Sequence, residues 1–292
     1  MEGTDINPTG TNSKPVLVLG ATGSVGRRTD ARLRGLGVPV RAASRHSATR
    51  FDWDDESTWE PALRGVGRMF LMAPDGVPVA PGFVDLAADL KVEHIVLLSS
   101  RAIEVIGDQR LLDAERAVKE SGVDWTVLRS DWFDQNFDEG PFREAVLAGE
   151  LAVPVGECRQ AFVDLDDVAA VAAHTLTEEG HAGRTYEVTG PRALSFGEVC
   201  GIIGGLTGRP LRFHGDEDAY RAALDLPEDA LDQTLASFAA LRDLGDTEPR
   251  DTVPRLTGRP AGTFEEYAMA AAHRWHSAEE AGRPGSTERP EG

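Results

Sequence analysis

The sequence predicts an α/β protein in which a doubly wound parallel sheet is followed by a smaller, helix-rich C-terminal part. Three observations support this fold class. In the first half, short apolar runs alternate with amphipathic stretches, as in parallel sheets whose strands are buried on both faces. A glycine-rich turn follows the first apolar run and opens a helix. The second half is less regular and mostly helical in pattern.

The expected strands are short, rich in aliphatic side chains and bounded by Gly, Pro, Ser or charged residues. They lie at 16–19, 38–42, 68–72, 94–99 and 125–128. The helices expected between them lie at 25–35, 59–63, 82–90 and 111–121. Strand, helix and strand at this spacing imply right-handed crossovers. These bring the carboxyl ends of the strands, where ligands bind in such sheets, to one edge.

In the second half, the pattern predicts helices at 141–149, 164–177, 195–207, 219–244 and 263–275, short extended pieces at 151–163 and a strand at 184–188. Ser195 with Glu198 three residues later has the pattern of a capping box at the start of a helix. Asp164, Asp166 and Asp167 also stand at a helix start, where carboxylates cap the backbone and complement the helix dipole. We therefore expect no metal site there.

Composition excludes several classes of protein. The chain has 292 residues, 49 acidic against 30 basic side chains and a net charge of −19, which disfavours binding to nucleic acid. Two cysteines cannot build a disulfide framework or a four-ligand zinc site. No apolar run is long enough to span a membrane, and the N-terminus lacks the apolar core of a secretory signal. We expect a soluble, cytoplasmic protein without membrane or nucleic-acid partners.

The glycine-rich turn is the strongest functional signal in the chain. It reads Gly20-Ala-Thr-Gly23-Ser-Val-Gly26, directly after the first expected strand. Gly20 permits a tight turn, Gly23 lets the backbone approach a pyrophosphate, and Gly26 lets the helix pack closely on the sheet. This is the pattern of a Rossmann dinucleotide site, whose helix N-terminus attracts the phosphates. The expected cofactor-binding residues of this turn are Gly20, Thr22, Gly23, Ser24, Val25 and Gly26.

The end of the second expected strand indicates which dinucleotide is bound. A cofactor without a 2′-phosphate is usually held there by Asp or Glu, but here Ser44 and Arg45 follow the strand. The Arg45 guanidinium is suited to bind a 2′-phosphate through two hydrogen bonds, and Ser44 and Arg41 are expected to contribute further contacts. NADPH is therefore favoured, although NADH stays possible. Further cofactor contacts are expected from Asp52 and Trp53 near the adenine, and from Met72, Ala73 and Pro74 over the ribose and pyrophosphate.

The chain resembles the NmrA-like family of atypical short-chain dehydrogenases/reductases over roughly residues 15–275. Beside the glycine turn, the segments that carry the resemblance are Phe51-Asp-Trp-Asp-Asp-Glu-Ser-Thr-Trp, Ala62-Leu-Arg-Gly-Val, Ile95-Val-Leu-Leu-Ser-Ser, Ser121-Gly-Val-Asp-Trp-Thr-Val-Leu-Arg, Trp132-Phe133 with Gln135-Asn136-Phe137, Phe162-Val-Asp-Leu-Asp-Asp-Val-Ala, Gly183-Arg-Thr-Tyr-Glu-Val-Thr-Gly and Leu256-Thr-Gly-Arg-Pro. The resemblance implies an NADP-type Rossmann domain and a small C-terminal substrate domain. The family includes quinone, azo-dye and triphenylmethane reductases, ketoreductases that tailor aromatic polyketides, and non-catalytic redox sensors.

These observations predict a division of the chain into four parts. Residues 1–14 are expected to be a flexible leader and 276–292 a disordered tail, because both are polar and poor in aliphatics. Residues 15–150 form the expected cofactor-binding domain, to which 184–190 return as a further strand. Residues 151–275 form the expected substrate-binding and lid region.

The usual proton donor of the wider superfamily, a Tyr-x-x-x-Lys pair, is absent. The three tyrosines are Tyr186, Tyr220 and Tyr267, and the residues four positions later are Gly190, Leu224 and Ala271. Ser99 and Ser100 end an expected strand where the superfamily keeps its catalytic serine, and they are the catalytic candidates, although capping of the strand end would explain them equally well. The expected substrate-binding residues are Asp131, Trp132, Phe133 and Asn136, for which a plain core role is the alternative.

These observations support an NADPH-dependent ketoreductase or quinone reductase. Hydride would pass to a carbonyl of an aromatic, polyketide-type small molecule, as in antibiotic biosynthesis. A flat, conjugated hydride acceptor suits an active site that lacks the tyrosine proton donor. The alternative is a non-catalytic NADP(H)-binding redox sensor that regulates a protein partner. A third and weaker hypothesis is a lyase or isomerase in which the Rossmann turn has only a structural role. We expect a monomer or a homodimer.

Overall fold

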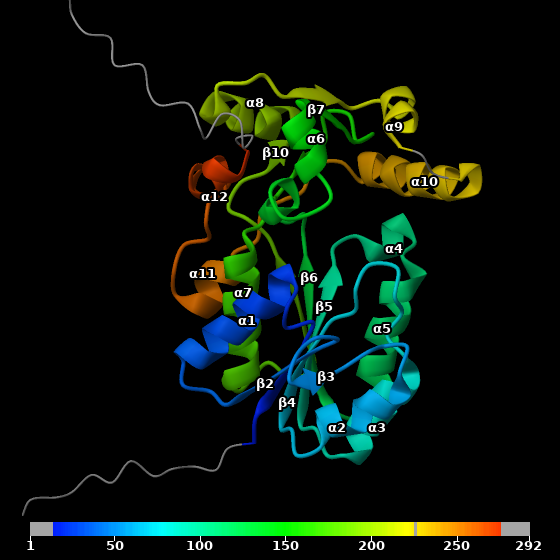
Figure 1. Cartoon of the computed structure of the whole chain (residues 1–292), viewed down its shortest axis with the longest axis vertical. Helices are drawn as coiled ribbons and strands as arrows, with labels where there is room; N and C mark the ends of the chain where they lie inside the picture. The colour runs from blue at the N-terminus through cyan, green and yellow to red at the C-terminus, as the bar shows by residue number, and fades with distance from the viewer. Residues whose placement is uncertain (1–13, 225–226, 276–292) are drawn as a thin grey trace, which may run out of the picture. The chain divides into compact units, whose positions relative to one another are not determined.

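The computed structural model describes residues 14–224 and 227–275 (Figure 1). The expected tail 276–292 and all but the last residue of the expected leader 1–14 lie outside the described residues. None of the described helices is long and apolar enough to cross a membrane.

A seven-stranded sheet has the order β3-β2-β1-β4-β5-β6-β9. Its strands are β1 (Val16–Leu19), β2 (Val40–Ser44), β3 (Thr49–Arg50), β4 (Arg68–Leu71), β5 (His94–Ser100), β6 (Asp124–Ser130) and β9 (Arg184–Val188). β1 pairs in parallel with both β2 and β4, and β4 pairs in parallel with β5. The order reverses at β1, so the carboxyl ends of β1 and β4 flank the point where open α/β sheets bind ligands. The fold is a Rossmann-like α/β fold with a helical C-terminal region.

The chain divides into two compact units of three segments each. Unit 1 comprises residues 1–98, 113–127 and 172–184, and unit 2 comprises residues 99–112, 128–171 and 185–292. β5, β6 and β9 each run from one unit into the other, as do two of the helices, α5 (Gln109–Glu120) and α7 (Leu165–Thr177).

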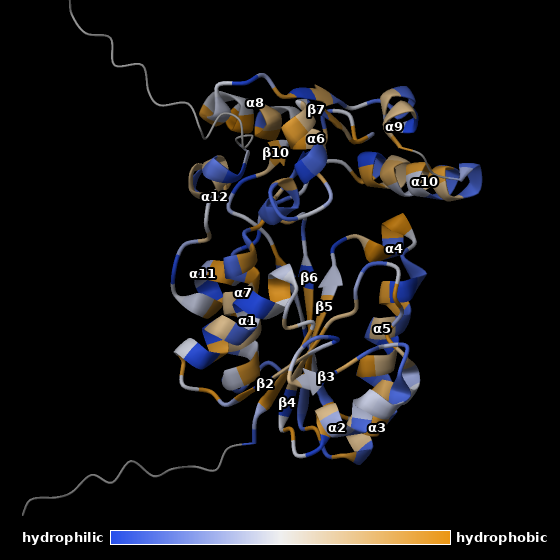
Figure 2. Cartoon of the chain, viewed as in Figure 1, coloured by the Kyte–Doolittle hydropathy of each residue, from blue (hydrophilic) through white to orange (hydrophobic). Residues whose placement is uncertain are grey.

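Unit 1 contains α1 (Ser24–Gly35), η1 (Glu56–Thr58), α2 (Trp59–Leu63) and α3 (Pro81–Asp89). α1 lies on one face of the sheet, and α2 and α3 lie on the other (Figure 1). The strands carry much of the apolar surface, whereas the helices alternate apolar and polar residues (Figure 2). This pattern buries aliphatic strands between amphipathic helices, which is what the sequence periodicity predicts.

Unit 2 carries the remaining elements. Its helices are α4 (Ile103–Ile106), η2 (Asp134–Phe137), α6 (Arg143–Ala148), α8 (Phe196–Thr207), α9 (Glu217–Ala223), α10 (Glu228–Leu244), α11 (Thr252–Thr257), α12 (Phe264–Ala271) and η3 (Ala272–Trp275). Two small sheets pair β8 (Arg159–Gln160) with β10 (Leu194–Ser195), and β7 (Glu150–Ala152) with β11 (Arg212–His214). A second apolar core, centred on buried Phe137, Phe162 and Phe196, holds this unit together.

The structure refines several element boundaries. β2 begins at Val40, two residues later than predicted, because Pro39 has no amide proton to offer the sheet and Val38 N–H is bonded to Leu33 at the end of α1. The helix predicted over 219–244 is divided into α9 and α10, and Pro227 is the N-cap of α10. The capping box of α8 is confirmed: Ser195 and Glu198 each bond the backbone N–H of the other.

Candidate functional site

The glycine turn forms a sharp elbow between β1 and α1. Gly20 has φ of +62°, a left-handed conformation that side chains disfavour. The Gly23 N–H donates to Gly20 O at 2.8 Å, and the Ala21 N–H donates to Ala43 O, at the end of β2, at 3.2 Å. These bonds fold the elbow back over the ends of two adjacent strands.

The first turn of α1 carries no side-chain cap. Gly23 is the N-cap and provides no side-chain cap, and no acidic residue stands in this turn. The first N–H groups of a helix have no intrahelical partner, so this end attracts an anion. A Cβ at Gly26 would lie 2.2 Å from Gly20 O, so only glycine lets the helix start this close to the elbow. This geometry suits a pyrophosphate.

The residues that follow β2 have different surroundings. Arg45 is exposed, whereas Ser44 is buried and its hydroxyl lies 2.7 Å from that of Ser47. The Arg41 guanidinium donates to two backbone carbonyls, those of Ala62 and Arg64. Arg45 is therefore the residue of this group whose guanidinium is best exposed to meet a phosphate.

The other expected cofactor contacts lie at the ends of strands in the same unit. The Trp53 ring packs edge-on against Phe51 and Phe83, with centroids 4.9 and 5.2 Å away, and so contributes to the core as well. Asp52 accepts the indole N–H of Trp59 through its carbonyl oxygen at 3.0 Å. Met72 contacts the elbow directly through its sulfur, beside Gly20, while Ala73 is partly exposed and Pro74 exposed.

The two catalytic candidates differ in exposure. Ser99 is buried, at 5% exposure, and Ser100 is partly exposed. The Ser100 hydroxyl donates to the backbone carbonyl of Arg101 at 3.3 Å, near the upper limit for a hydrogen bond. Such a bond is easily exchanged for one to another oxygen, which makes Ser100 the better placed of the two.

The substrate candidates after β6 are held by backbone and ring contacts. Asp131 is buried and accepts the Trp132 N–H at 2.8 Å, and burial raises the pKa of its carboxyl. The Trp132 ring stacks with Phe142, at a centroid distance of 5.7 Å and an interplanar angle of 27°, and with Phe238, at 6.4 Å and 9°. Trp132 is thus part of an aromatic cluster in unit 2, and Phe238 brings α10 into it.

Phe133 and Asn136 continue this segment into η2. Phe133 forms an isolated parallel bridge with Val163. The Asn136 carbonyl accepts the Phe142 N–H at 2.9 Å, and a Cβ at Gly140 would lie 2.8 Å from Asn136 Cα. Both residues are partly exposed.

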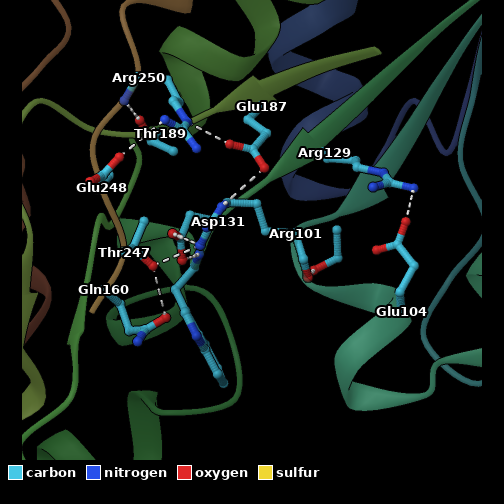
Figure 3. Close-up of polar contacts among 12 residues, drawn as sticks. Arg101, Glu104, Arg129, Asp131, Gln160, Glu187, Thr189, Thr247, Glu248 and Arg250 are labelled. Carbon is cyan, nitrogen blue, oxygen red and sulfur yellow. Dashed lines mark hydrogen bonds and ion pairs between the residues drawn. The ribbon is translucent and has the colours of Figure 1, made fainter. Parts of the chain in front are cut away.

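Sequence reasoning missed Arg101, which contacts three segments of unit 2 (Figure 3). Its side chain is 15% exposed and lies beside Asp131 and Glu187, with nitrogen–oxygen distances of 3.4 and 3.7 Å. Its Nη1 also donates to Thr247 Oγ1 at 2.7 Å. Glu187 and Thr247 are 86 and 146 positions away along the chain, so no local pattern could reveal this group.

It also missed Asp134, whose carboxyl is fully buried. Neither oxygen has a hydrogen-bond partner among the described residues. Burial, followed by the charges of Asp164, Asp167 and other carboxylates, raises its pKa well above the ordinary value. Burial and the neighbouring carboxylates thus both favour the protonated form of Asp134.

The aspartates at the start of α7 have different partners. The Asp164 carboxylate accepts the Asp166 N–H at 2.7 Å, and Asp167 lies 2.7 Å from Arg259 and accepts the Gly262 N–H. Within residues 14–224 and 227–275, no group of three or more His, Cys, Asp or Glu side chains is placed to hold a metal ion.

Comparison with known proteins gives the family. No family model matches the chain. It is 32% identical over 283 residues to the NAD(P)H azoreductase of Xenophilus azovorans, covering 88% of this chain and 98% of the relative. It is 35% identical over 280 residues to the (4-alkanoyl-5-oxo-2,5-dihydrofuran-3-yl)methyl phosphate reductase of Streptomyces griseus, with coverage of 88% and 98%.

Solved structures share the fold. The NADPH complex of the Escherichia coli quinone oxidoreductase QOR2 matches with a TM-score of 0.73 at 23% identity, covering 87% of this chain and 99% of that one. A double mutant of NmrA matches with a TM-score of 0.67 at 16% identity, covering 88% and 94%. Fold and elbow together define a Rossmann-type protein of the short-chain dehydrogenase/reductase class. Within this class, the chain belongs to the NmrA-like family of atypical members.

Proposed function

We propose that this protein is an NADPH-dependent reductase that delivers hydride to a quinone or ketone carbonyl of an aromatic small molecule. The coarser part of this statement, an NAD(P)H-dependent oxidoreductase that acts on a small molecule, agrees with its relatives: an NAD(P)H azoreductase, a reductase of a furanone phosphate and a quinone oxidoreductase. The observation that carries the proposal is the elbow at Gly20–Gly26, with an uncapped helix end behind it.

The choice of NADPH rests on Arg45. An exposed guanidinium follows β2, where an acidic residue would hold the free ribose hydroxyl of NADH. Two parallel N–H groups of arginine match two oxygens of a phosphate, and such charge-assisted bonds are stronger than neutral ones. The elbow would hold the pyrophosphate, and Arg45 the 2′-phosphate.

The chemistry asks little of the protein beyond orientation. A bound NADPH supplies the hydride. Ser100 would donate a hydrogen bond to the substrate oxygen that gains negative charge, in exchange for its long bond to Arg101 O. Ser99, Asp131, Trp132, Phe133 and Asn136 would complete the substrate side, with the aromatic rings suited to a flat conjugated molecule. A quinone fits a site without the tyrosine because its reduced form is a stabilised phenolate that water can protonate.

The test is NADPH oxidation by the purified protein, followed by absorbance, with a panel of naphthoquinones, azo dyes and hydroxylated polycyclic ketones. We expect turnover with at least one quinone, a lower kcat for Ser100→Ala, and loss of turnover for Gly26→Ala. Full binding of NADPH by calorimetry with no turnover on the whole panel would contradict the proposal.

A redox sensor is the second candidate, and the missing Tyr-x-x-x-Lys pair favours it. A sensor would bind NADP(H) at the same elbow and pass the signal to a protein partner. Calorimetry and turnover together separate the two: a sensor binds the cofactor with an affinity that depends on its redox state, and oxidises none of it. We also propose that the protein acts in the cytoplasm as a monomer or homodimer.

A further inference from the structure

Arg101 stands directly after the catalytic candidates. β5 ends at Ser100, and the Arg101 backbone is fixed on both sides: its N–H donates to Ser130 O at 3.0 Å, and its carbonyl accepts the Ser100 hydroxyl. A change in the position of Arg101 therefore moves the acceptor that orients Ser100.

The Arg101 side chain reaches three other parts of unit 2 (Figure 3). Asp131 follows β6, Glu187 belongs to β9, and Thr247 lies in the loop between α10 and α11. The Asp131 side chain is 3% exposed and that of Arg101 15%, so their contact is largely shielded from water. Removing the guanidinium would leave a buried carboxylate without its positive partner, which is unfavourable.

The loop after α10 is attached to this centre at several points. Thr247 N–H donates to Arg159 O at 2.8 Å, and Thr247 Oγ1 lies 3.4 Å from Gln160 Oε1. Further along, the Arg250 N–H donates to Thr189 Oγ1 and its Nε to Glu187 Oε2, both at 2.7 Å. The same loop therefore bonds to Arg101 through Thr247 and to Glu187, a carboxylate beside Arg101, through Arg250.

We propose that Arg101 is a positioning residue: one guanidinium fixes the Ser100 acceptor, the Asp131–Trp132 segment and the loop that follows α10 in a single arrangement. These three segments are distant in sequence, and two of them carry substrate-side candidates. This inference rests on the proposed reductase function for its kinetic consequence, but its structural consequence can be measured without any substrate.

Arg129 offers a matched control. It is an arginine of similar burial, 18% exposed, on the neighbouring strand β6, and it pairs with Glu104 at 2.7 Å (Figure 3). Its carboxylate partner is 55% exposed and belongs to α4. Arg129→Met removes the same number of atoms and the same charge as Arg101→Met.

The first readout is amide hydrogen exchange without substrate or cofactor. We expect Arg101→Met to speed exchange of the Thr247 and Arg250 amides at least tenfold relative to wild type, and Arg129→Met to leave both unchanged. Thr247→Val, which keeps the guanidinium but removes its hydroxyl acceptor, should speed exchange of the Thr247 amide alone. Equal exchange in all four proteins would overturn the proposal even if the protein proves to be no reductase.

The second readout is kinetic, with a quinone that the wild type reduces. We expect Arg101→Met to raise the KM for the quinone about tenfold or more, a change of about 1.4 kcal/mol, with little change in NADPH affinity. Arg101→Lys should recover part of this loss, because it restores the charge but cannot contact Asp131, Glu187 and Thr247 together. Identical KM values for Arg101→Met and Arg129→Met would overturn it.

The pH profile separates positioning from simple loss of packing. The charged groups that face Asp131 are Arg101 after β5 and, further out, Glu187 on β9 with Arg250 in the loop. Burial raises the pKa of Asp131 and Arg101 opposes that rise, so without Arg101 the carboxyl is protonated up to higher pH. Arg101→Met should therefore shift the pH dependence of the remaining activity to higher pH, whereas Arg101→Lys should follow the wild-type profile. A profile for Arg101→Met parallel to that of the wild type would count against the proposal.

Discussion

The sulfur of Met72 occupies the space that a side chain at position 20 would need: a Cβ on Gly20 would lie 2.5 Å from it. Gly20 follows β1 and Met72 follows β4, the strand paired with it, so the contact joins two adjacent strand ends at the cofactor elbow. Gly20 thus faces two separate restrictions, a close side chain and a positive φ.

Gly20→Ala should lower the free energy of unfolding by about 1–2 kcal/mol, since an L side chain in the left-handed region costs about that much. NADPH binding should weaken with it. The double variant Gly20→Ala/Met72→Ala removes the close contact but not the φ of +62°, so it should recover only part of the affinity. Gly35→Ala is the control, because its Cβ would meet nothing within 4 Å in the last turn of α1. Chemical denaturation measures the stability and calorimetry the NADPH affinity. Equal losses of stability and affinity in Gly20→Ala and Gly35→Ala would contradict this explanation.

Arg45→Ala should weaken NADPH binding about tenfold or more and leave NADH binding unchanged. A hydrogen bond to a charged group contributes about 1.5–3 kcal/mol, and only NADPH carries the 2′-phosphate. Arg50→Ala, at another exposed arginine that pairs with Asp52 and Asp55, serves as the control for general loss of positive charge. Calorimetry with both cofactors makes the comparison. If the two variants lose the same affinity for NADPH, Arg45 does not select the cofactor.

The fold was predictable where local chemistry decides it. The apolar runs located the central strands, and the pair Ser195 and Glu198 located the start of α8, because strand burial and capping depend on neighbours a few residues apart. The sequence predicted for Gly190 only a place at the end of a strand. The structure adds that its Cβ would lie 1.9 Å from Phe162 O, a close backbone approach that no spacing of residues could have indicated.

The candidate site was predictable only in part. The elbow has a sequence signature because one turn of chain builds it. Arg101 and Asp134 have none, because their roles come from long-range neighbours and from burial. The roles of Arg45, Ser99 and Ser100 stay predictions, since the amino-acid pattern indicates where they stand but not what they bind.

Asp134→Asn should stabilise the protein above neutral pH. The folded pKa of Asp134 is raised well above the unfolded value, so the stability present at low pH is lost as pH rises from about 4 through the folded pKa. Asparagine does not ionise, so the variant should unfold at higher denaturant concentration than the wild type, by about 1 kcal/mol or more near pH 8. The advantage should shrink toward pH 4.

Asp138→Asn is the matched control for Asp134→Asn. The Asp138 carboxylate accepts the Tyr267 hydroxyl at 2.7 Å and pairs with Arg274 at 2.8 Å, so its loss should destabilise the protein at neutral pH. Denaturation curves across the pH range compare the two. A wild type whose stability is flat between pH 4 and 8 would show that Asp134 does not titrate as expected.

His94 should make the protein less stable in mild acid. It is buried at the start of β5, where its Nε2 lies 2.9 Å from Thr126 Oγ1. Burial, with Arg68 next, lowers its pKa to about 4. The unfolded chain takes up a proton near pH 6.5 and the folded one only near 4, so stability falls as pH drops through that window, by up to about 1.4 kcal/mol per unit.

His94→Gln should flatten this acid dependence, because its amide keeps a polar contact to Thr126 and does not ionise. Thermal unfolding between about pH 4 and 7 measures the slope. His273→Gln, at an exposed position in η3, is the comparison and should leave the slope as it is in the wild type. An unchanged slope in the His94 variant would assign the acid sensitivity to other groups.

The interleaved path of the polypeptide has a practical result for protein engineering. Each compact unit is assembled from three stretches of chain, and β5, β6 and β9 each belong to both. No single cleavage or truncation point yields either unit as one uninterrupted fragment. Chimaeras between relatives should therefore exchange loops at the strand ends, such as the one after α10, and leave every crossing strand intact.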